Sequence, residues 1–283
     1  MIVHLIDGTY ELFRHFYGIR RGSATPPPMS AVAGVLGTVV QMLETGATHI
    51  AVATDHVIES FRNGMWPGYK TGQGIDRLLW AQFHPLEEAL VAMGVVTWPM
   101  VDLEADDALA SAAHLAALDE RVEKVCIWTP DKDLAQCVVG GRVVQVDRKS
   151  GQIRDEQGVR VKFGVTPALI PDFLALVGDA ADGYPGIPRF GLKTAAKVLE
   201  KYGPIEDFPA DVLGGHLEHA LLFKRLAMLR KDAPLFADVD QLRWAGPAPG
   251  FEVMAEKIGD RRLAGRVREL MQTVVDRSGA GVE

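Results

Sequence analysis

The sequence contains few cysteines and no apolar run that could cross a membrane. Only two of its 283 residues are cysteines, Cys126 and Cys137, which excludes a disulfide framework and matches no metal-ligand spacing. The longest apolar stretch, residues 29–43, is interrupted by glycines and a glutamine and is too short to span a bilayer. The first residues lack the basic start and the cleavage site of a secretory signal. We therefore expect a cytoplasmic location.

The sequence also lacks an excess of positive charge. Its net charge is −7, whereas proteins that bind nucleic acids non-specifically usually carry a basic surface. Two interpretations compete: an ordinary acidic enzyme, or a cluster of carboxylates that holds cations and leaves the remaining surface closer to neutral. The positions of the acids decide between them.

Short apolar runs alternate with helical patterns over the first 165 residues. This alternation predicts an α/β fold, in which a central, mostly parallel sheet has helices on both faces. The expected strands are residues 2–6, 48–54, 95–98, 122–128 and 142–146, and the expected helices are 9–17, 30–43, 76–93 and about 105–118. Residues 20–28, which include three successive prolines, and the Gly-rich, basic segment 61–74 are expected to be loops.

Helical patterns dominate after about residue 165. They cover residues 167–177, 192–202 and 216–230. We therefore expect an α/β core over residues 1–165, with a lid or arch at about 61–93, and a helical region over residues 166–283.

Acidic residues stand where the predicted strands end. Asp7, Asp55 and Asp131 end three of the strands, and the carboxyl ends of parallel strands meet at one edge of a sheet. Any one of them is explained equally well as a turn residue or a helix cap. Together they are not, because crowded carboxylates would be forced to protonate unless cations neutralised them. Four further acids belong to this cluster: Glu104, Asp106, Asp107 and Asp133.

The cluster contains only oxygen ligands. An all-oxygen site without histidine or cysteine suits Mg²⁺ or Mn²⁺. Pairs of such hard cations are the usual solution for displacement at phosphorus. The sequence therefore predicts a site for divalent metal ions that acts on phosphate esters.

The helical region adds a second acidic motif and a basic turn. Asp179 and Asp182 lie in a Gly-flanked loop, which an Asx-turn alone would also explain. The segment 185–195 then predicts a tight turn that enters a helix, with Lys193 and Lys197 one turn apart. Such a helix start binds backbone phosphates, although a solvated basic face is the alternative.

In this order, the motifs resemble the 5′ nuclease family, which comprises the flap endonucleases and the 5′–3′ exonuclease domain of bacterial DNA polymerase I. The resemblance runs from Ile6 to about Gly203. It is carried by Asp7-Gly8 with Leu12 and Arg14, Phe61-Arg62 with Tyr69-Lys70, Glu104-Ala105-Asp106-Asp107, Asp131-Lys132-Asp133-Leu134-Ala135-Gln136, Gly178-Asp179-Ala180-Ala181-Asp182, and Pro185-Gly186 to Ala195.

The resemblance implies a role for each matching residue. Nine acids would bind two divalent ions: Asp7, Asp55, Glu104, Asp106, Asp107, Asp131, Asp133, Asp179 and Asp182. Lys70 would contact the scissile phosphate, and Arg14, Arg62 and Arg77 are further candidates for this role. A helix–three-turn–helix at about residues 183–202 would grip duplex DNA, with a K⁺ site, through Gly186, Arg189, Gly191, Lys193, Thr194 and Lys197.

The sequence departs from the family pattern at three positions. Gln73 stands where an arginine usually follows the lid lysine, and Arg77 is its nearest substitute. Arg189 replaces the first glycine of the hairpin, at a position whose backbone conformation an arginine resists. Gly183 replaces an asparagine. No polymerase region follows, so the expected protein is a stand-alone nuclease.

We therefore expect a structure-selective, sequence-independent 5′ nuclease that acts on DNA. The nearest alternative is a PIN-type ribonuclease, which shares the sheet and several of the acids. A non-catalytic branched-DNA-binding protein and a metal-dependent phosphatase of small esters are the others. The basic turn after the loop that carries Asp179 and Asp182 favours the 5′ nuclease over these alternatives.

Overall fold

The computed structural model describes residues 1–21 and 27–279. Residues 22–26 of the predicted loop 20–28 lie outside this range. Six strands form one sheet in the order β3-β2-β1-β4-β5-β6. The first five pair in parallel and β6 pairs with β5 in antiparallel fashion, which confirms the predicted mostly parallel sheet. The strands are β1 Ile2–Asp7, β2 His49–Asp55, β3 Val96–Met100, β4 Lys124–Trp128, β5 Val143–Asp147 and β6 Gln152–Arg154.

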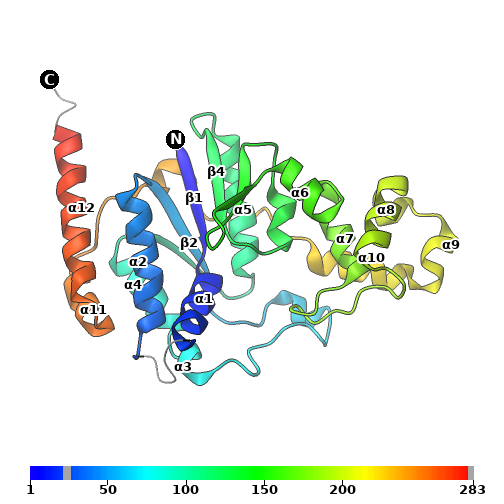
Figure 1. The fold of residues 1–283 in the computed structure, drawn as a ribbon, viewed down its shortest axis with the longest axis horizontal. Coiled ribbons are helices and arrows are strands. Elements are labelled where there is room, and N and C mark those ends of the chain that lie inside the picture. The colour runs from blue at the N-terminus through cyan, green and yellow to red at the C-terminus, as the bar shows by residue number, and fades with distance from the viewer. Residues whose placement is uncertain (22–26, 280–283) are drawn as a thin grey trace.

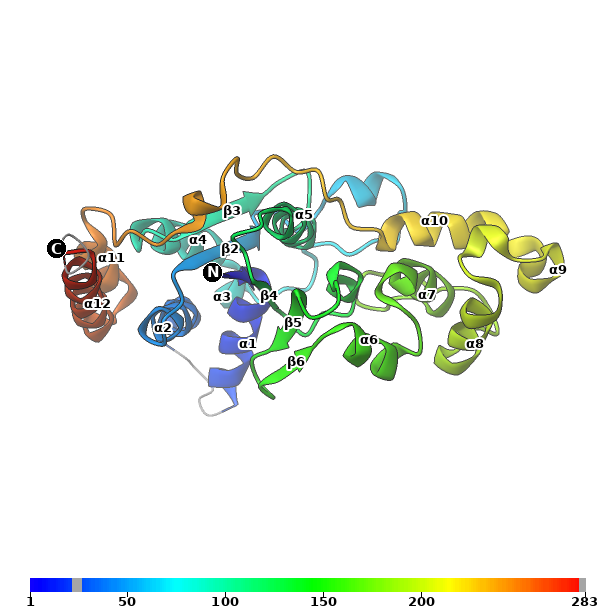
Figure 2. The same ribbon diagram turned by 90° about the horizontal axis from the view of Figure 1, so that it is seen from above.

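Helices cover both faces of the sheet, as Figure 2 shows. Successive residues of a strand point to opposite faces, so Ile6 packs on one side and Leu5 on the other. The Ile6 side is covered by α1 Gly8–Arg20, α2 Ser30–Glu44 and α4 Phe83–Ala92, and the Leu5 side by α5 Ala105–Leu118.

The helix predicted over residues 76–93 is interrupted in the structure. It is divided into α3, Arg77–Trp80, and α4, with Ala81 and Gln82 as a turn between them. The side chain of Gln82 accepts hydrogen bonds from the backbone N–H groups of Ala31 and Val32 at 3.1 and 3.3 Å. It thereby satisfies amides at the start of α2, which has no capping side chain of its own. Helix α4 is thus part of the core and lies outside any lid.

A third hydrophobic cluster holds the first half of the helical region. It joins α6 Glu156–Phe163, α7 Ile170–Val177, α8 Leu192–Tyr202 and α10 Leu217–Ala227. Strand β6 and helix α6 were not predicted, because the exposed hairpin and the short polar helix give weak patterns. A short helix, α9 Ala210–Leu213, precedes α10. This helical unit forms one end of the molecule (Figure 1).

The last two helices return to the sheet unit. They are α11, Phe251–Ile258, and α12, Arg261–Gly279. Phe251, Ile258, Leu263 and Val267 are buried in the same cluster as α2 and α4. Figure 1 shows them at the end of the molecule opposite to α8 and α10. Helices α11 and α12 were predicted to belong to the helical DNA-binding region, but their apolar faces pack on the core instead. No helix in the described ranges has both the length and the apolar character that a membrane crossing requires.

Candidate metal-binding active site

The parallel topology brings acids from three strands to one edge. Asp7 and Asp55 are the last residues of the adjacent strands β1 and β2, and Asp131 follows β4 on the other side of β1. Asp55 accepts a hydrogen bond from the backbone N–H of Ala105 at 2.8 Å. This bond fixes the start of α5, whose first turn carries Asp106.

The Asp7 side chain is held by two donors. Its two oxygens accept hydrogen bonds from the backbone N–H of Tyr10 at 2.8 Å and from the hydroxyl of Thr129 at 3.0 Å. Thr129 was not predicted as a site residue, although its place two residues before Asp131 is a usable signal. The carboxylate therefore has a fixed orientation at the sheet edge.

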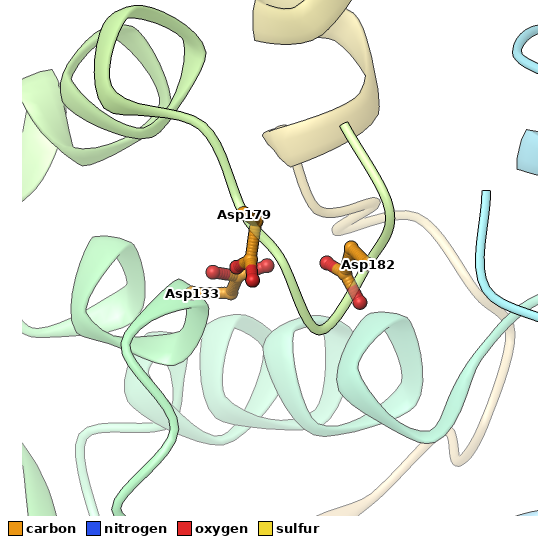
Figure 3. Close-up of side chains that lie close together, drawn as sticks. All are labelled: Asp133, Asp179 and Asp182. Carbon is orange, nitrogen blue, oxygen red and sulfur yellow. The ribbon is translucent and has the colours of Figure 1, made fainter. Parts of the chain in front are cut away.

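A second group of acids comes from the helical unit. Asp179 and Asp182 lie in the loop after α7 and face Asp133 (Figure 3). One carboxylate oxygen from each of the three residues lies within 4.8 Å of the others. The buried Oδ1 of Asp133 has no hydrogen-bond partner in the part of the chain that the structure describes. Oxygen ligands at this separation, one of them unpartnered, fit a hard divalent cation.

Electrostatics link the two groups. Burial, together with Asp55 and Asp131, raises the pKa of Asp7 to about 7. Burial and the charges of Asp131 and Asp7 raise the pKa of Asp106 well above its usual range. The pKa of Asp133 is also raised, by burial first and then by Asp131. Asp131 thus acts on both groups, and without cations these carboxylates resist ionisation.

Two lysines neutralise part of this charge. The Nζ atom of Lys70 lies 2.7 Å from Glu104 and 3.3 Å from Asp182. Burial alone would lower the pKa of Lys70, but these acids outweigh it and raise the pKa well above its usual value. Lys132, which was not predicted, pairs with Asp179 at 2.8 Å. Its position inside the Asp131–Asp133 motif was the available signal. Both ammonium groups therefore offset the negative charge of the clustered carboxylates.

Two predicted site residues pair with each other instead. The guanidinium of Arg62 donates two hydrogen bonds to Asp107, at 2.7 and 2.8 Å, and two more to the backbone oxygens of Leu226 and Met228. Arg62 is 1% exposed and Asp107 is fully buried. Bidentate pairing uses both Asp107 oxygens, so the geometry gives these residues a structural role that differs from the expected metal and phosphate contacts.

The other two predicted arginines lie away from the acids. Arg14 is paired with Glu11 on α1, and Arg77 is exposed at the start of α3. Neither forms an ion pair with any of the nine predicted metal ligands in the described residues.

The lid segment is docked on the acidic loop. The backbone N–H of Lys70 donates to the carbonyl oxygen of Asp182 at 3.0 Å, and the indole N–H of Trp66 donates to that of Gly183 at the same distance. Gly183 has φ +82°, and a Cβ atom there would lie 1.9 Å from the oxygen of Gly68. A glycine is therefore required for this contact.

The loop between α7 and α8 forms the predicted turn. Gly186 has φ +72°, and a Cβ atom there would lie 2.4 Å from the nitrogen of Gly178, so its role is to let two backbone segments meet. Arg189 adopts φ +75°, the left-handed conformation that glycine favours. Gly191 caps α8. The side chains of Arg189, Lys193, Thr194 and Lys197 are exposed.

Two buried polar side chains, hydrogen-bonded in series, fix the backbone of Asp131. The amide of Gln145 donates to the backbone oxygen of Asp131 at 2.6 Å, and Arg154 on β6 donates to Gln145 at 2.9 Å. Both side chains are buried. Neither residue was predicted, because a single glutamine on a strand gives no signal until its partner on β6 is known.

The sheet with acids at its carboxyl edge, joined to a helical unit with an exposed basic turn, defines a 5′ nuclease fold. The chain belongs to the 5′–3′ exonuclease family: residues 2–164 match its N-terminal resolvase-like domain and residues 165–249 match its C-terminal SAM fold. The family resemblance expected from the motifs is confirmed.

Curated relatives include polymerases and shorter proteins. The chain is 32% identical over 259 residues to DNA polymerase I of Pseudomonas aeruginosa, an alignment that covers 84% of this chain and 28% of the polymerase. It is 29% identical over 254 residues to a 5′–3′ exonuclease of Buchnera aphidicola, covering 82% and 88% of the two chains. The chain thus spans less than a third of the polymerase relatives.

Solved structures share the fold at low sequence identity. T5 5′-exonuclease with bound zinc matches with a TM-score of 0.65 and 15% identity, over 96% of this chain and 99% of the other. Flap endonuclease-1 from Methanococcus jannaschii matches with a TM-score of 0.65 and 16% identity, over 98% and 93%.

Proposed function

We propose that this protein is a structure-selective, sequence-independent 5′ nuclease that hydrolyses DNA phosphodiesters with two divalent ions. The observation that carries the proposal is the pair of carboxylate clusters, one at the sheet edge and one completed by the loop after α7, with Asp131 raising pKa values in both. Its family membership supports the same chemistry.

Each of the two clusters of carboxylates would hold one ion. Asp7, Asp55 and Asp106 would hold the first, and Asp133, Asp179 and Asp182 the second, with Asp131 between them. Three carboxylates per ion are sufficient, because Mg²⁺ retains several waters. When bound, two Mg²⁺ or Mn²⁺ ions would activate a water and stabilise the leaving oxygen.

Lys70 is the residue of this chain that we assign to the scissile phosphate. Its ammonium lies among the acids, paired with Glu104 and Asp182. Metal ions bound by the acids would neutralise their negative charge. The ion pairs that hold the Lys70 ammonium would then be weaker. The ammonium is then available to a phosphate held at the same edge, with its position fixed by the backbone bond to Asp182. Arg14 and Arg77 are secondary candidates, whereas Arg62 has a structural role.

The exposed start of α8 would grip the phosphate backbone of the DNA. Helix N-termini present unpaired N–H groups to anions, and Lys193 and Lys197 add positive charge within one turn. These groups contact backbone and not bases, which fits binding without sequence preference. Arg189 adopts the backbone conformation of a glycine, so we retain a K⁺ site in this turn as part of the proposal. The cytoplasmic location also stays a prediction.

A cleavage panel tests the proposal. Flap, nicked duplex, single-stranded DNA and the matching RNA are incubated with Mg²⁺, Mn²⁺ or chelator, using wild-type protein, Asp106→Asn and the control Asp211→Asn on the exposed helix α9. We expect cleavage of 5′-ended DNA junctions only with metal, lost in Asp106→Asn and retained in Asp211→Asn. Preferential RNA cleavage would support a PIN-type ribonuclease, and junction binding without cleavage a non-catalytic DNA-binding protein. Hydrolysis of a chromogenic ester alone would support a phosphatase.

A further inference from the structure

A pocket of about 340 Å³ lies between the lid segment and the helical unit. Trp66 lines it from the lid, Pro188 and Phe190 from the turn before α8, and His216 and His219 from the start of α10. Its volume lies in the range of about 300–1,000 Å³ that is usual for small-ligand sites. In the described part of the chain, none of the nine predicted metal ligands lines it.

The lining of this pocket is aromatic and accessible. His216 and His219 are exposed, and Trp66 and Phe190 are half-buried. The buried ring of Phe223 also lines the pocket, with its centroid 5.2 Å from that of Trp66 and 6.1 Å from that of His219. The pocket therefore offers ring surface that a flat ligand from solution can reach.

The lining carries no fixed charge. In the described ranges, no Asp, Glu, Lys or Arg side chain lines the pocket, so a charged group would have no counter-ion inside it. The rings of His216 and His219 each have a donor and an acceptor nitrogen when neutral, and such atoms can pair with the polar edge of a heteroaromatic ring. The lining thus suits a flat, uncharged ring with a hydrogen-bonding edge, which is the chemistry of a nucleobase.

A positive charge stands directly beside the pocket. Arg189 lies between the lining residues Pro188 and Phe190 in the chain and does not line the pocket itself. Its side chain is exposed and has no ion-pair partner among the described residues. A nucleotide whose base entered the pocket would therefore have a guanidinium for its phosphate close by.

We propose that this pocket binds an unpaired base of the DNA, stacked on the aromatic lining, with a phosphate of the same strand at Arg189. The inference rests on the proposed function, because DNA held at the turn before α8 supplies the base. Stacking of bases on aromatic rings tolerates any sequence. A base bound here would contact the lid segment through Trp66 and the turn through Phe190. The alternative is that the pocket is only a gap where the lid segment meets the helical unit.

The test follows the indole N–H resonance of Trp66 by NMR in the full-length protein, assigned with Trp66→Phe. The probes are inorganic phosphate, a deoxynucleoside, its 5′-monophosphate, a blunt DNA duplex, and the same duplex with a single-stranded 5′ flap. Chelator keeps the DNA intact. Fluorescence anisotropy measures DNA binding separately, so that failure of the proposed function is distinguished from failure of this inference.

Four variants separate the ring, the charge and the surrounding turn. Phe190→Leu keeps an apolar side chain but removes the ring, whereas Phe190→Tyr keeps the ring. Arg189→Gln removes the charge beside the pocket. Leu192→Ala is the control, because Leu192 belongs to the same turn, is 64% exposed and lies outside the lining.

In wild type, we expect a saturable shift with the deoxynucleoside and its monophosphate, none with phosphate, and a larger shift with the flapped than with the blunt duplex. Phe190→Leu should weaken deoxynucleoside binding at least about fivefold, as for a lost base–aromatic stack, and Phe190→Tyr and Leu192→Ala should bind like wild type. Arg189→Gln should weaken binding of the monophosphate only, a result that stands even if Phe190→Leu fails to fold.

Three results would overturn the inference. They are no saturable shift with the deoxynucleoside, equal affinity in wild type and folded Phe190→Leu, or equal shifts from two duplexes that both bind by anisotropy. No DNA binding by anisotropy would refute the proposed function, and this inference with it.

Discussion

Several carboxyl groups of this protein have raised pKa values, and Asp7 shows the consequence most clearly. Burial, Asp55 and Asp131 raise its pKa from an ordinary value to about 7 in the metal-free protein. A raised folded-state pKa contributes stability at pH values below the unfolded pKa, near 4, and this contribution is lost as the pH rises through about 7. The acidic site should therefore destabilise the metal-free fold at alkaline pH.

Asp7→Asn should accordingly stabilise the metal-free protein at pH 8 by more than about 1 kcal/mol, and by clearly less at pH 5, where the loss has only begun. Chemical denaturation in chelator at both pH values measures the difference, and comparing the variant with wild type cancels the contribution of the histidines. Asp211→Asn is the control. A variant no more stable than wild type at pH 8 contradicts the electrostatic description of this residue.

Lys70 is the second residue with a separable prediction. If its ammonium stabilises charge that develops in the transition state, Lys70→Ala should slow single-turnover cleavage about 100-fold and change DNA affinity less than about threefold. Lys257→Ala, on the distant helix α11, is the control. An unchanged rate with weakened binding would reduce Lys70 to an ordinary phosphate contact.

Among the contacts between elements, the one that positions Lys70 joins the lid segment to the loop that carries Asp179 and Asp182. Gly183→Ala would place a Cβ atom 1.9 Å from the oxygen of Gly68, so the lid must move and Lys70 with it. Gly151→Ala is a matched control, because Gly151 has φ +69° but nothing within 4 Å of an added Cβ. Gly151→Ala should lose about 1 kcal/mol of stability from its positive φ alone, and Gly183→Ala more, because the clash is added. Only Gly183→Ala should lose cleavage, by at least about tenfold, and equal activity in the two variants would show that docking is dispensable.

The start of α8 gives an element-scale prediction about DNA binding. Replacing Lys193 and Lys197 by alanine should flatten the log–log salt dependence of duplex binding by about two units, one per lost phosphate contact. Lys257→Ala/Arg268→Ala removes two charges from α11 and α12 and should leave the slope unchanged. If the Lys193/Lys197 variant keeps the wild-type slope, these side chains form only a solvated face.

The sequence predicted the elements best where hydrophobic periodicity is strong. Strands β1, β2 and β4 and the acids beside them follow from apolar runs that end at an aspartate or, for β4, three residues before one. The break at Gln82 was not predictable, because it depends on a contact with α2, fifty residues away in the chain. The same holds for Arg62 and Asp107. Their motifs match the family, but only the tertiary structure shows that they are bonded to each other.

At the scale of the whole molecule, the acids that we propose as metal ligands come from two units. The sheet edge supplies Asp7, Asp55 and Asp106, and the helical unit supplies Asp179 and Asp182 from the loop that leads to α8. In the proposed function, binding of DNA at α8 and completion of the second metal site would therefore involve the same segment. Helices α11 and α12 lie at the opposite end and pack on the sheet unit.

The central claim, two divalent ions held by two carboxylate groups, is tested most directly by a metal titration. Calorimetry with Mn²⁺ is carried out on wild type, Asp179→Ala/Asp182→Ala and the control Asp211→Asn, beside cleavage assays on the same preparations. We predict two sites in wild type and control, and one site with strongly reduced cleavage in the double variant. One site in all three proteins, with equal cleavage, would contradict the account and leave Asp179 and Asp182 as structural residues of a turn.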